Sequence, residues 1–408
     1  MILALQATLL SSLLLISLPH HTDARYTVTA KRTSVHPVID KQRNPGSSIF
    51  DFNYNPGYFT YQNATYLMVR VQNKTNDPKS NSSLFPYGGP SVFAVSKVLS
   101  PTQVTPIRAS DVVFGNGIDD IEDPRIIYDD KKSTWYMYYT KSEAPNNTTC
   151  TGTNPCARLS VAICSDDPTS PQGWIDHGPL WPNSDVNNFQ WTKSGAVIPS
   201  QDSSNLKDHP HLLIWSNWCT FNPWVSPLYV QLAYSYESLK GPWIILPSPL
   251  MDKREPPAYD SYVLESGPPP VRIKKTGDWL FVYNGARKCP TSKPNYERCY
   301  AMGWLILDGK DPTKVLQRSS LEEPLLVPTL EWEIGNTTMG DQTPNAVFMD
   351  GALFRWESES ESGDGSVERS GGEKEEFVAF YGGSDTAVGS MIVSVGVEEE
   401  TESFDDEM

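Results

Sequence analysis

Five aromatic-rich apolar segments are spread along the chain, and each ends in polar or small residues. They are Thr65–Val71, Trp135–Thr140, Leu212–Trp218, Trp279–Gly285 and Phe377–Gly383. Gly, Pro and Asn separate them and helical periodicity is scarce, which predicts short strands in an all-β repeat architecture. Five repeats of this size predict a five-bladed β-propeller, in which one strand end per blade reaches a central pocket. Most Trp and Tyr side chains are then expected to fill the interfaces between blades.

The beginning of the chain resembles a secretory signal. Residues 1–24 contain the apolar run Leu9–Leu18 and end on a small residue. No Lys or Arg precedes that run, so an uncleaved signal anchor is the alternative. The predicted propeller domain then occupies residues 25–397. A secreted or lumenal glycoprotein, free of the membrane once the signal is cleaved, is also favoured by six Asn-x-Ser/Thr sequons, at Asn63, Asn73, Asn81, Asn146, Asn147 and Asn336.

The cysteine content also fits an oxidising compartment, because the count of six is even. Spacing alone does not fix the connectivity. A zinc site is the alternative use of these thiols, but the chain has no paired CxxC. As disulfides, Cys150 and Cys156 would close a small loop and Cys289 and Cys299 would join a hairpin, which leaves Cys164 and Cys219 as the third pair.

The formal net charge of −16 is concentrated in two acidic segments. Residues 356–376 carry eight acids and two bases, and residues 398–408 carry seven acids and no base, which leaves −3 for the rest. Both segments are rich in Ser, Gly or Glu and are expected to be solvated. The first interrupts a β region and is predicted to be a long hairpin insertion, and the second a disordered tail. No basic patch is present, which argues against a nucleic-acid partner.

Three carboxylates occupy equivalent ends of different repeats. Asp123 lies in the run Glu122–Arg125 (EDPR), where Pro124 fixes a turn at a strand entrance. Glu265 precedes a rigid Gly-Pro-Pro-Pro bend, and Asp385 follows two glycines after an aromatic strand. Taken singly, each could be an ordinary turn or loop residue in solvent. Taken together, two carboxylates that converge across a cavity can hydrolyse a glycoside, one as proton donor and one as the base that activates water.

The order of several motifs resembles glycoside hydrolase family 130, five-bladed propeller enzymes that act on β-mannosides. The resemblance extends from about Asn55 to Val395, and its most specific part runs from Gly267 to Arg318. The motifs that carry it are NPGY from Asn55, EDPR from Glu122, KSGAVIP from Lys193, SGPPPVRI from Ser266, WLFVYNGA from Trp279, YAMGWLILDGKDPTKVLQRS from Tyr300, EPLLVPTLEWE from Glu323, AVFMDGALF from Ala346 and FYGGSDTAVG from Phe380.

The resemblance implies a catalytic acid at Asp123, which is thought in this family to pass its proton through a sugar hydroxyl. It also implies substrate-binding roles for a set of polar residues. Asn55, Arg70, Tyr300 and Asp385 fall on motif positions associated with sugar binding, and Arg125, Lys193 and Asn284 are placed with them as candidate substrate-binding residues.

Departures from the motifs favour the hydrolytic members over the phosphorylases. Phosphate needs several charge-assisted donors. The family's YHG motif is Tyr283-Asn284-Gly285 here, so its His is lost, and the family's Arg after a third-blade strand is replaced by Ser216 and Asn217. Glu265 lies in the stretch where the family has a Lys, and like-charge repulsion there disfavours phosphate. We therefore expect an inverting β-mannosidase with Glu265 as general base.

Other functions remain open at this point. A phosphorylase would use Arg70, Arg125 and Lys193 for phosphate. A propeller of another specificity, such as an arabinosidase or fructosidase, is a second alternative, although no WMNDPNG-like start is present. A non-catalytic sugar-binding propeller and a purely structural one are the remaining classes. No cofactor is expected, because two carboxylates suffice for hydrolysis. No metal is expected, because His209 and His211 alternate as structural strand residues do. The oligomeric state is open.

Overall fold

The computed structural model describes residues 25–41, 46–73, 89–143, 156–181, 191–202, 204–218, 228–290, 298–336, 343–356 and 374–398. The described chain is all-β, as the sequence predicts. Its helical structure is a single turn of α-helix, α1 (Glu331–Ile334), and a 3₁₀ turn at Ala109–Asp111. Within these residues no helix is long and apolar enough to cross a membrane.

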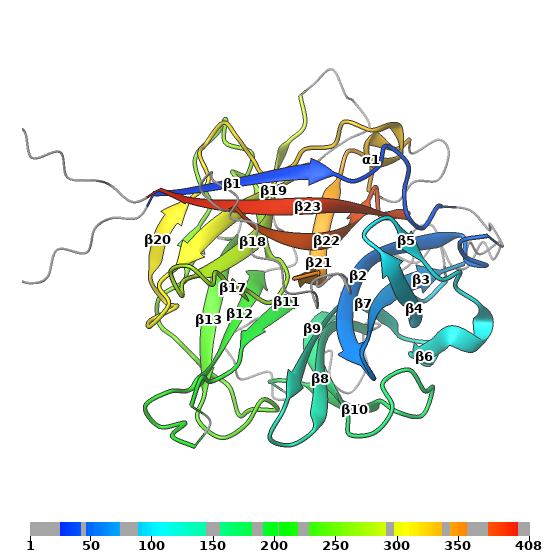
Figure 1. Cartoon of the computed structure of the whole chain (residues 1–408), viewed down its shortest axis with the longest axis horizontal. Helices are drawn as coiled ribbons and strands as arrows, with labels where there is room; N and C mark the ends of the chain where they lie inside the picture. Colours follow the sequence, from blue (N-terminus) through cyan, green and yellow to red (C-terminus); the bar gives the residue numbers. More distant parts are fainter. Residues whose placement is uncertain are drawn as a thin grey trace, which may run out of the picture.

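The strands pair antiparallel in five successive groups around a common centre (Figure 1). Parallel bridges from Gly57 to Gly351 and from Trp191 to Ala157 join the first group to the fifth and the second to the third, so the strands form three hydrogen-bonded sheets. The first group contains β2 (Phe52–Tyr61), β3 (Ala64–Gln72), β4 (Val92–Ser100), β5 (Gln103–Val104) and β6 (Val112–Phe114). The second contains β7 (Asp120–Asp129), β8 (Thr134–Glu143), β9 (Cys156–Cys164) and β10 (Ile175–Pro179). The third contains β11 (Trp191–Ile198), β12 (His211–Trp218), β13 (Leu228–Ser235), β14 (Ile244–Ile245) and β15 (Met251–Asp252).

The last two groups complete the ring. The fourth contains β16 (Val263–Ser266), β17 (Val271–Arg272), β18 (Trp279–Lys288), β19 (Arg298–Leu307) and β20 (Val315–Arg318). The fifth contains β21 (Val347–Phe354), β22 (Glu375–Gly383) and β23 (Ala387–Glu398), and β1 (Arg25–Arg32) pairs along the outer edge of β23. The beginning and the end of the described chain are therefore held in one sheet.

Each aromatic-rich segment forms the second long strand of its group, within β3, β8, β12, β18 and β22, which confirms all five strand predictions. The alternation of β8 shows why these strands are aromatic on both faces. Trp135, Met137 and Tyr139 pack into one core, while Tyr136 and Tyr138 pack into the next. Successive side chains of a strand point to opposite faces, so a strand between two cores has no solvent face and carries apolar residues throughout.

Five such cores link neighbouring groups, and a sixth, smaller cluster around Val263, Ala286 and Phe348 adds to the contact between groups four and five. One core joins groups one and two, the next joins two and three, and the following ones join three to four and four to five. The fifth core contains residues of β3 and β4 together with β21, β22 and β23, so it joins group five back to group one. The ring leaves the first strands β2, β7, β11, β16 and β21 in contact around its centre.

The acidic segment at residues 356–376 connects the antiparallel pair β21 and β22, in which Phe354 lies opposite Val378. Residues 357–373 and 399–408 lie outside the described part of the chain, so the predicted insertion and tail remain predictions.

The disulfide predictions have three outcomes. Cys289 and Cys299 are bonded to each other across the paired strands β18 and β19, as predicted. Cys164 is a buried free thiol, so the predicted bond to Cys219 is wrong. Its surroundings give the physical reason, because Cys164 packs as a small apolar residue between Trp135 and Trp174 in the core that joins the first two groups. The predicted bond from Cys150 to Cys156 lies outside the described side chains.

Candidate active site

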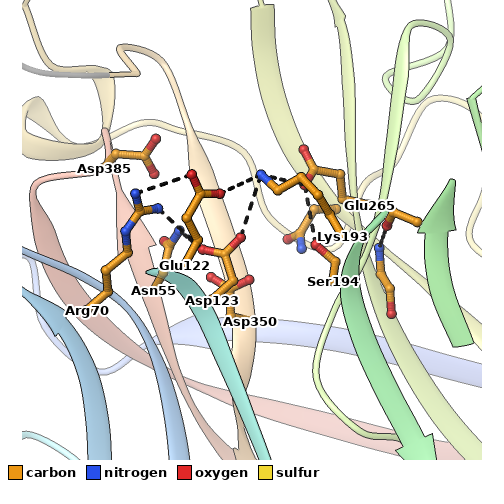
Figure 2. Close-up of polar contacts among 12 residues, drawn as sticks. Asn55, Arg70, Glu122, Asp123, Lys193, Ser194, Glu265, Asp350 and Asp385 are labelled. Carbon is orange, nitrogen blue, oxygen red and sulfur yellow. Dashed lines mark hydrogen bonds and ion pairs between the residues drawn. The ribbon is translucent and has the colours of Figure 1, made fainter. Parts of the chain in front are cut away.

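Four of the first strands carry a β-bulge at an equivalent place near the centre. The register shifts between Tyr54 and Gly57 in β2, between Glu122 and Arg125 in β7, between Lys193 and Ala196 in β11, and between Phe348 and Ala352 in β21. A bulge inserts an extra residue and turns its side chain away from the ordinary alternation. The bulges hold Asn55, Asp123, Ser194 and Asp350, and these polar side chains are directed toward the centre of the ring (Figure 2).

The backbone at three of these bulges adopts positive φ angles. Asn55, Asp123 and Ser194 have φ angles of 48°, 61° and 57°. Positive φ is uncommon for residues other than glycine and concentrates at functional sites. Two neighbouring glycines allow the bulged strands to touch, because a Cβ at Gly57 or at Gly351 would lie 2.3 or 2.4 Å from the carbonyl oxygen of Pro124. The centre is thus a place of close backbone packing.

Asp123 is held from two sides. The Nδ2 of Asn55 donates a hydrogen bond to its Oδ1 over 3.0 Å, and the guanidinium of Arg70 lies 3.6 Å from the same oxygen. Arg70 also contacts Asp120 at 3.2 Å and Glu122 at 3.5 Å, and its Nε donates to the hydroxyl of Ser91. The side chain of Asp123 is only 3% exposed, so its contacts are set by the protein.

The ammonium of Lys193 lies between Glu122 and Asp123 on one side and Glu265 on the other (Figure 2). Its Nζ is 2.8 Å from Glu122, 3.9 Å from Asp123 and 3.9 Å from Glu265. Burial acts to lower the pKa of Lys193, but the three carboxylates outweigh it and hold that pKa well above its ordinary value. Burial likewise acts to raise the pKa of Glu122, yet Lys193 and Arg70 lower it to about 2.

Glu265 receives two further hydroxyl contacts. Tyr300 donates to Oε1 over 3.0 Å, and Ser194 lies 3.4 Å from Oε2. Burial raises the pKa of Glu265, Lys193 opposes that effect, and the charge of Asp123 adds to it, so the net pKa is raised. A buried carboxylate with a raised pKa takes up a proton more readily than an ordinary Glu, as a general base must.

Arg125 lies behind these carboxylates and is fully buried. Its guanidinium donates to the carbonyl oxygens of Asp123, Ser266 and Gly267, and it forms a 2.7 Å ion pair with Asp350. Burial, and then the charge of Asp123, raise the pKa of Asp350 well above its ordinary value. Arg125 therefore joins the bulge of β7 to the end of β16, which carries Glu265.

Two other predicted substrate-binding residues also bind the protein itself. The amide of Asn284 exchanges hydrogen bonds with both backbone groups of Met349, at 2.9 Å each, and so fastens β18 to β21. Asp385 accepts a hydrogen bond from the hydroxyl of Thr343. Its carboxyl lies on the Arg70 side of the cluster (Figure 2), and burial raises its pKa.

The site carries more acidic than basic side chains. The three buried or nearly buried bases described so far are Arg70, Lys193 and Arg125, and each is paired with carboxylates. A fourth base, Arg298, acts on the pKa values of both Glu265 and Tyr300. The carboxyls are those of Asp120, Glu122, Asp123, Glu265, Asp350 and Asp385. Neutral hydroxyl-rich ligands suit such a site better than anions do.

Sequence reasoning assigned no role to Glu122, Ser194 or Asp350. A signal for them was present, because a small polar residue is followed by Pro or Gly at each centre: Asn55-Pro56, Asp123-Pro124, Ser194-Gly195, Ser266-Gly267 and Asp350-Gly351. Alignment of these five dipeptides would have found Ser194 and Asp350.

Among the described residues, no group of three or more His, Cys, Asp or Glu side chains is arranged to hold a metal ion. His211 instead accepts a hydrogen bond from the backbone of Ser200 over 2.9 Å, and burial lowers its pKa to about 4. This is a structural role for the second histidine of the His209–His211 pair.

Comparisons with known proteins agree with the motifs. A β-1,2-mannobiose phosphorylase from Thermoanaerobacter sp. (strain X514) is 31% identical over 128 residues, which cover 31% of this chain and 30% of the relative. A 1,2-β-oligomannan phosphorylase from the same organism is 24% identical over 219 residues, or 51% of this chain and 56% of the relative. The matches thus span about a third to just over half of each relative's length. No protein-family model matches the chain.

Solved structures share the fold over most of the chain. One comes from work on family 130 glycoside hydrolases that target β-1,2-mannosidic linkages in Candida mannan; it has a TM-score of 0.59 at 18% identity and covers 92% of this chain and 95% of its own. A β-1,2-mannobiose phosphorylase from Listeria innocua has a TM-score of 0.59 at 16% identity, with 90% and 96% covered. The chain is thus similar over part of its sequence to two mannoside phosphorylases, and it shares the fold of a structure from glycoside hydrolase family 130.

Proposed function

We propose that this chain is a five-bladed propeller glycoside hydrolase that cleaves β-mannosidic linkages with inversion. The five antiparallel groups would be the blades, and the ring of five shared cores supports that count. The mannoside specificity comes from the family's relatives, which act on β-1,2-linked mannosides. The observation that carries the proposal is the position of Asp123 and Glu265 on opposite sides of one buried ammonium.

In the proposed reaction Asp123 is the proton donor to the leaving oxygen, directly or through a sugar hydroxyl as the family resemblance implies. Asn55 and Arg70 hold its carboxyl in place. Glu265 is the base that accepts a proton from water, and Tyr300 orients it. Because an oxygen of each carboxylate lies 3.9 Å from the Nζ of Lys193, the two oxygens are at most twice that distance apart. That limit of 7.8 Å (twice 3.9 Å) reaches the lower part of the roughly 6.5–9.5 Å separation of inverting pairs and also includes the roughly 5–5.5 Å of retaining pairs, so the proposed inversion rests on the family resemblance.

Charge favours water over phosphate as the nucleophile. Arg70, Lys193 and Arg125 are each committed to carboxylates, and Glu265 adds a negative charge where a phosphorylase needs a cation. A phosphate dianion placed among these carboxylates would be repelled, whereas water would not.

Substrate contacts are proposed for Asn55, Arg70, Lys193 and Asp385, which lie together in the central cluster (Figure 2). Tyr300, which donates a hydrogen bond to Glu265, is proposed with them. Arg125 and Asn284 are proposed as supports rather than ligands, because their hydrogen bonds are made to the protein. The Cys289–Cys299 bond fits an oxidising compartment. We propose a secreted or lumenal location on that ground and on the predicted signal and sequons.

The test is turnover of β-1,2- and β-1,4-mannobiose by the purified protein, with and without inorganic phosphate. We expect free mannose at the same rate in both conditions, and its loss in the Glu265→Gln variant. Mannose 1-phosphate formed only when phosphate is present would overturn the proposal in favour of a phosphorylase. An absence of turnover on both sugars, with sugar binding retained, would favour a binding propeller.

A further inference from the structure

A second concave site lies at the other end of the inner strands from the carboxylate cluster. It is a cavity of about 1240 Å³ whose wall includes residues of β2, β3, β4, β17, β21 and β22. Asn55 stands near the start of β2, and the cavity surrounds the turn at the end of that strand. Eight residues of strand at about 3.3 Å each place Asn63 roughly 25 Å from Asn55, and the nearest wall residue on this strand, Tyr58, lies three residues or roughly 10 Å from Asn55. The cavity is therefore distinct from the proposed catalytic site.

The sequon at Asn63 opens into this cavity. Gln62 and Asn63 form the two-residue turn between β2 and β3, with φ angles of 48° and 58°. Positive φ at both positions is the signature of a type I′ hairpin turn, which Asn tolerates well. The side chain of Asn63 is exposed, and both Asn63 and the sequon's Thr65 line the cavity. A group attached to the Asn63 amide would start at the cavity wall.

The wall of the cavity has the chemistry that holds a sugar. The ring of Tyr58 stacks on Phe354 at 4.6 Å, and the half-buried ring of Trp356 lies next to Phe354 at 6.4 Å. Aromatic rings of this kind present apolar faces on which the C–H faces of pyranoses pack. Lys97 and Arg272, whose guanidinium stacks over Trp279, also line the cavity, and donor-only groups match the acetamide carbonyl and hydroxyl oxygens of an N-acetylhexosamine.

We propose that Asn63 carries an N-linked glycan whose first sugars lie in this cavity, over Tyr58 and Trp356. In the transfer step the Nδ2 of Asn63 attacks the anomeric carbon of a lipid-diphosphate-linked oligosaccharide. The new C–N bond replaces the C–O bond to the diphosphate, the lipid diphosphate leaves, and the amide nitrogen gives up one proton. The inference needs a glycosylating compartment, as the proposed location does, but it is independent of the hydrolytic reaction.

Two other sequons, whose asparagines lie in the described part of the chain, provide internal controls. Asn73 and Asn336 are exposed, and neither lines the cavity. A glycan seated in the cavity should resist a peptide N-glycosidase under native conditions, while one that projects into solvent should be released. We expect release at Asn63 to be roughly tenfold slower or more in the native protein, since local opening must come first, and to match the other sites after denaturation.

The experiment uses the full chain secreted from a glycosylating eukaryotic cell line, with glycopeptide mass spectrometry at each site. Thr65→Ser keeps the sequon and Thr65→Ala removes it, so the pair separates the glycan from the substitution. Trp356→Ala keeps the sequon but removes the aromatic wall, and it should bring release at Asn63 up to the rate of the control sites. A second measurement does not depend on the Trp356 variant. Backbone hydrogen exchange around Tyr58 should be faster in Thr65→Ala, which lacks the glycan, than in Thr65→Ser, which keeps it.

An unmodified Asn63 in the secreted protein would overturn the inference. Native release from Asn63 at the rate of the control or denatured sites would overturn it too, as would identical hydrogen exchange in the two Thr65 variants. Mannoside turnover should be equal in the two variants, because Thr65 lies at the turn end of the β2–β3 hairpin, away from Asn55 and Arg70. Failure of the hydrolase proposal would therefore leave this result unaffected.

Discussion

Replacement of Lys193 by Met tests how much the ion pair between Lys193 and Glu122 stabilises the protein. The ammonium is 12% exposed and lies 2.8 Å from Glu122, so the variant leaves a nearly buried carboxylate without its closest cation. The pKa of Glu122 is lowered from 4.5 to about 2, and each pKa unit corresponds to about 1.4 kcal/mol, or about 3 kcal/mol in all. Lys193 is closer to Glu122 than Arg70, which lies at 3.5 Å. Loss of the lysine should therefore cost about 2 kcal/mol of unfolding free energy.

The pH dependence of that loss has a definite sign. A carboxylate with a depressed folded-state pKa stabilises the protein above its unfolded pKa, and this contribution is lost as the pH falls through the folded value. The deficit of Lys193→Met should thus be complete at pH 7 and shrink below about pH 4.5. Urea unfolding at a series of pH values measures this deficit in unfolding free energy. The control is Lys141→Met, because Lys141 is more exposed and its ion pairs with Asp119 and Asp176 should contribute at most about 1 kcal/mol.

The double variant Glu122→Gln/Lys193→Met should recover part of the stability, because it removes the unpaired charge. An unfolding free energy unchanged by Lys193→Met at pH 7 would refute the reasoning. So would a deficit that neither acid pH nor Glu122→Gln reduces.

Further predictions concern the base, its support and the disulfide. Glu265→Gln should lower kcat by about 10²–10⁴-fold with an unchanged Tm, and wild-type activity in this variant would remove the base assignment. Since the pKa of Glu265 is raised and a base must be deprotonated, kcat/KM should begin to fall with decreasing pH above the ordinary Glu value of about 4.3; an acid limb at or below that value would contradict the burial argument. Asp350→Ala leaves the fully buried Arg125 without its ion pair and should cost about 3–5 kcal/mol in urea unfolding, against a smaller loss for Asp350→Asn, which removes the charge but keeps a hydrogen-bond acceptor for Arg125. The double variant Cys289→Ser/Cys299→Ser opens a bond between residues ten positions apart and should cost about 2–3 kcal/mol; equal stability to the oxidised wild type would contradict that estimate.

The strands that could be predicted from the sequence are those whose own residue pattern shows which faces are buried. The run Trp135–Thr140 contains apolar side chains at odd and even positions, and the structure buries both faces in neighbouring cores. Local alternation and composition were enough for that inference. The pairing of β1 with β23 was not predictable in the same way, because it joins residues more than 350 positions apart and its strand has no distinctive pattern.

In the candidate site, too, some residues could be predicted from local motifs while the roles of others depend on the fold. Asp123 and Glu265 were predicted from their motifs and share the ammonium of Lys193. The roles of Arg125 and Asn284 were not predictable, since a polar side chain beside a site can face a ligand or fasten neighbouring strands, and only the fold decides. Cys164 illustrates the limit of counting cysteines, because its burial among aromatic rings, rather than the even total, determines its state.

The most direct test of the central proposal is the anomeric configuration of the first product. Proton NMR of β-mannobiose cleavage in the absence of phosphate distinguishes the anomers before they interconvert. The account predicts α-mannose as the first product, because water activated by Glu265 attacks the face opposite the bond that Asp123 protonates. β-Mannose appearing first would contradict the inverting pair, and a requirement for phosphate would contradict hydrolysis itself.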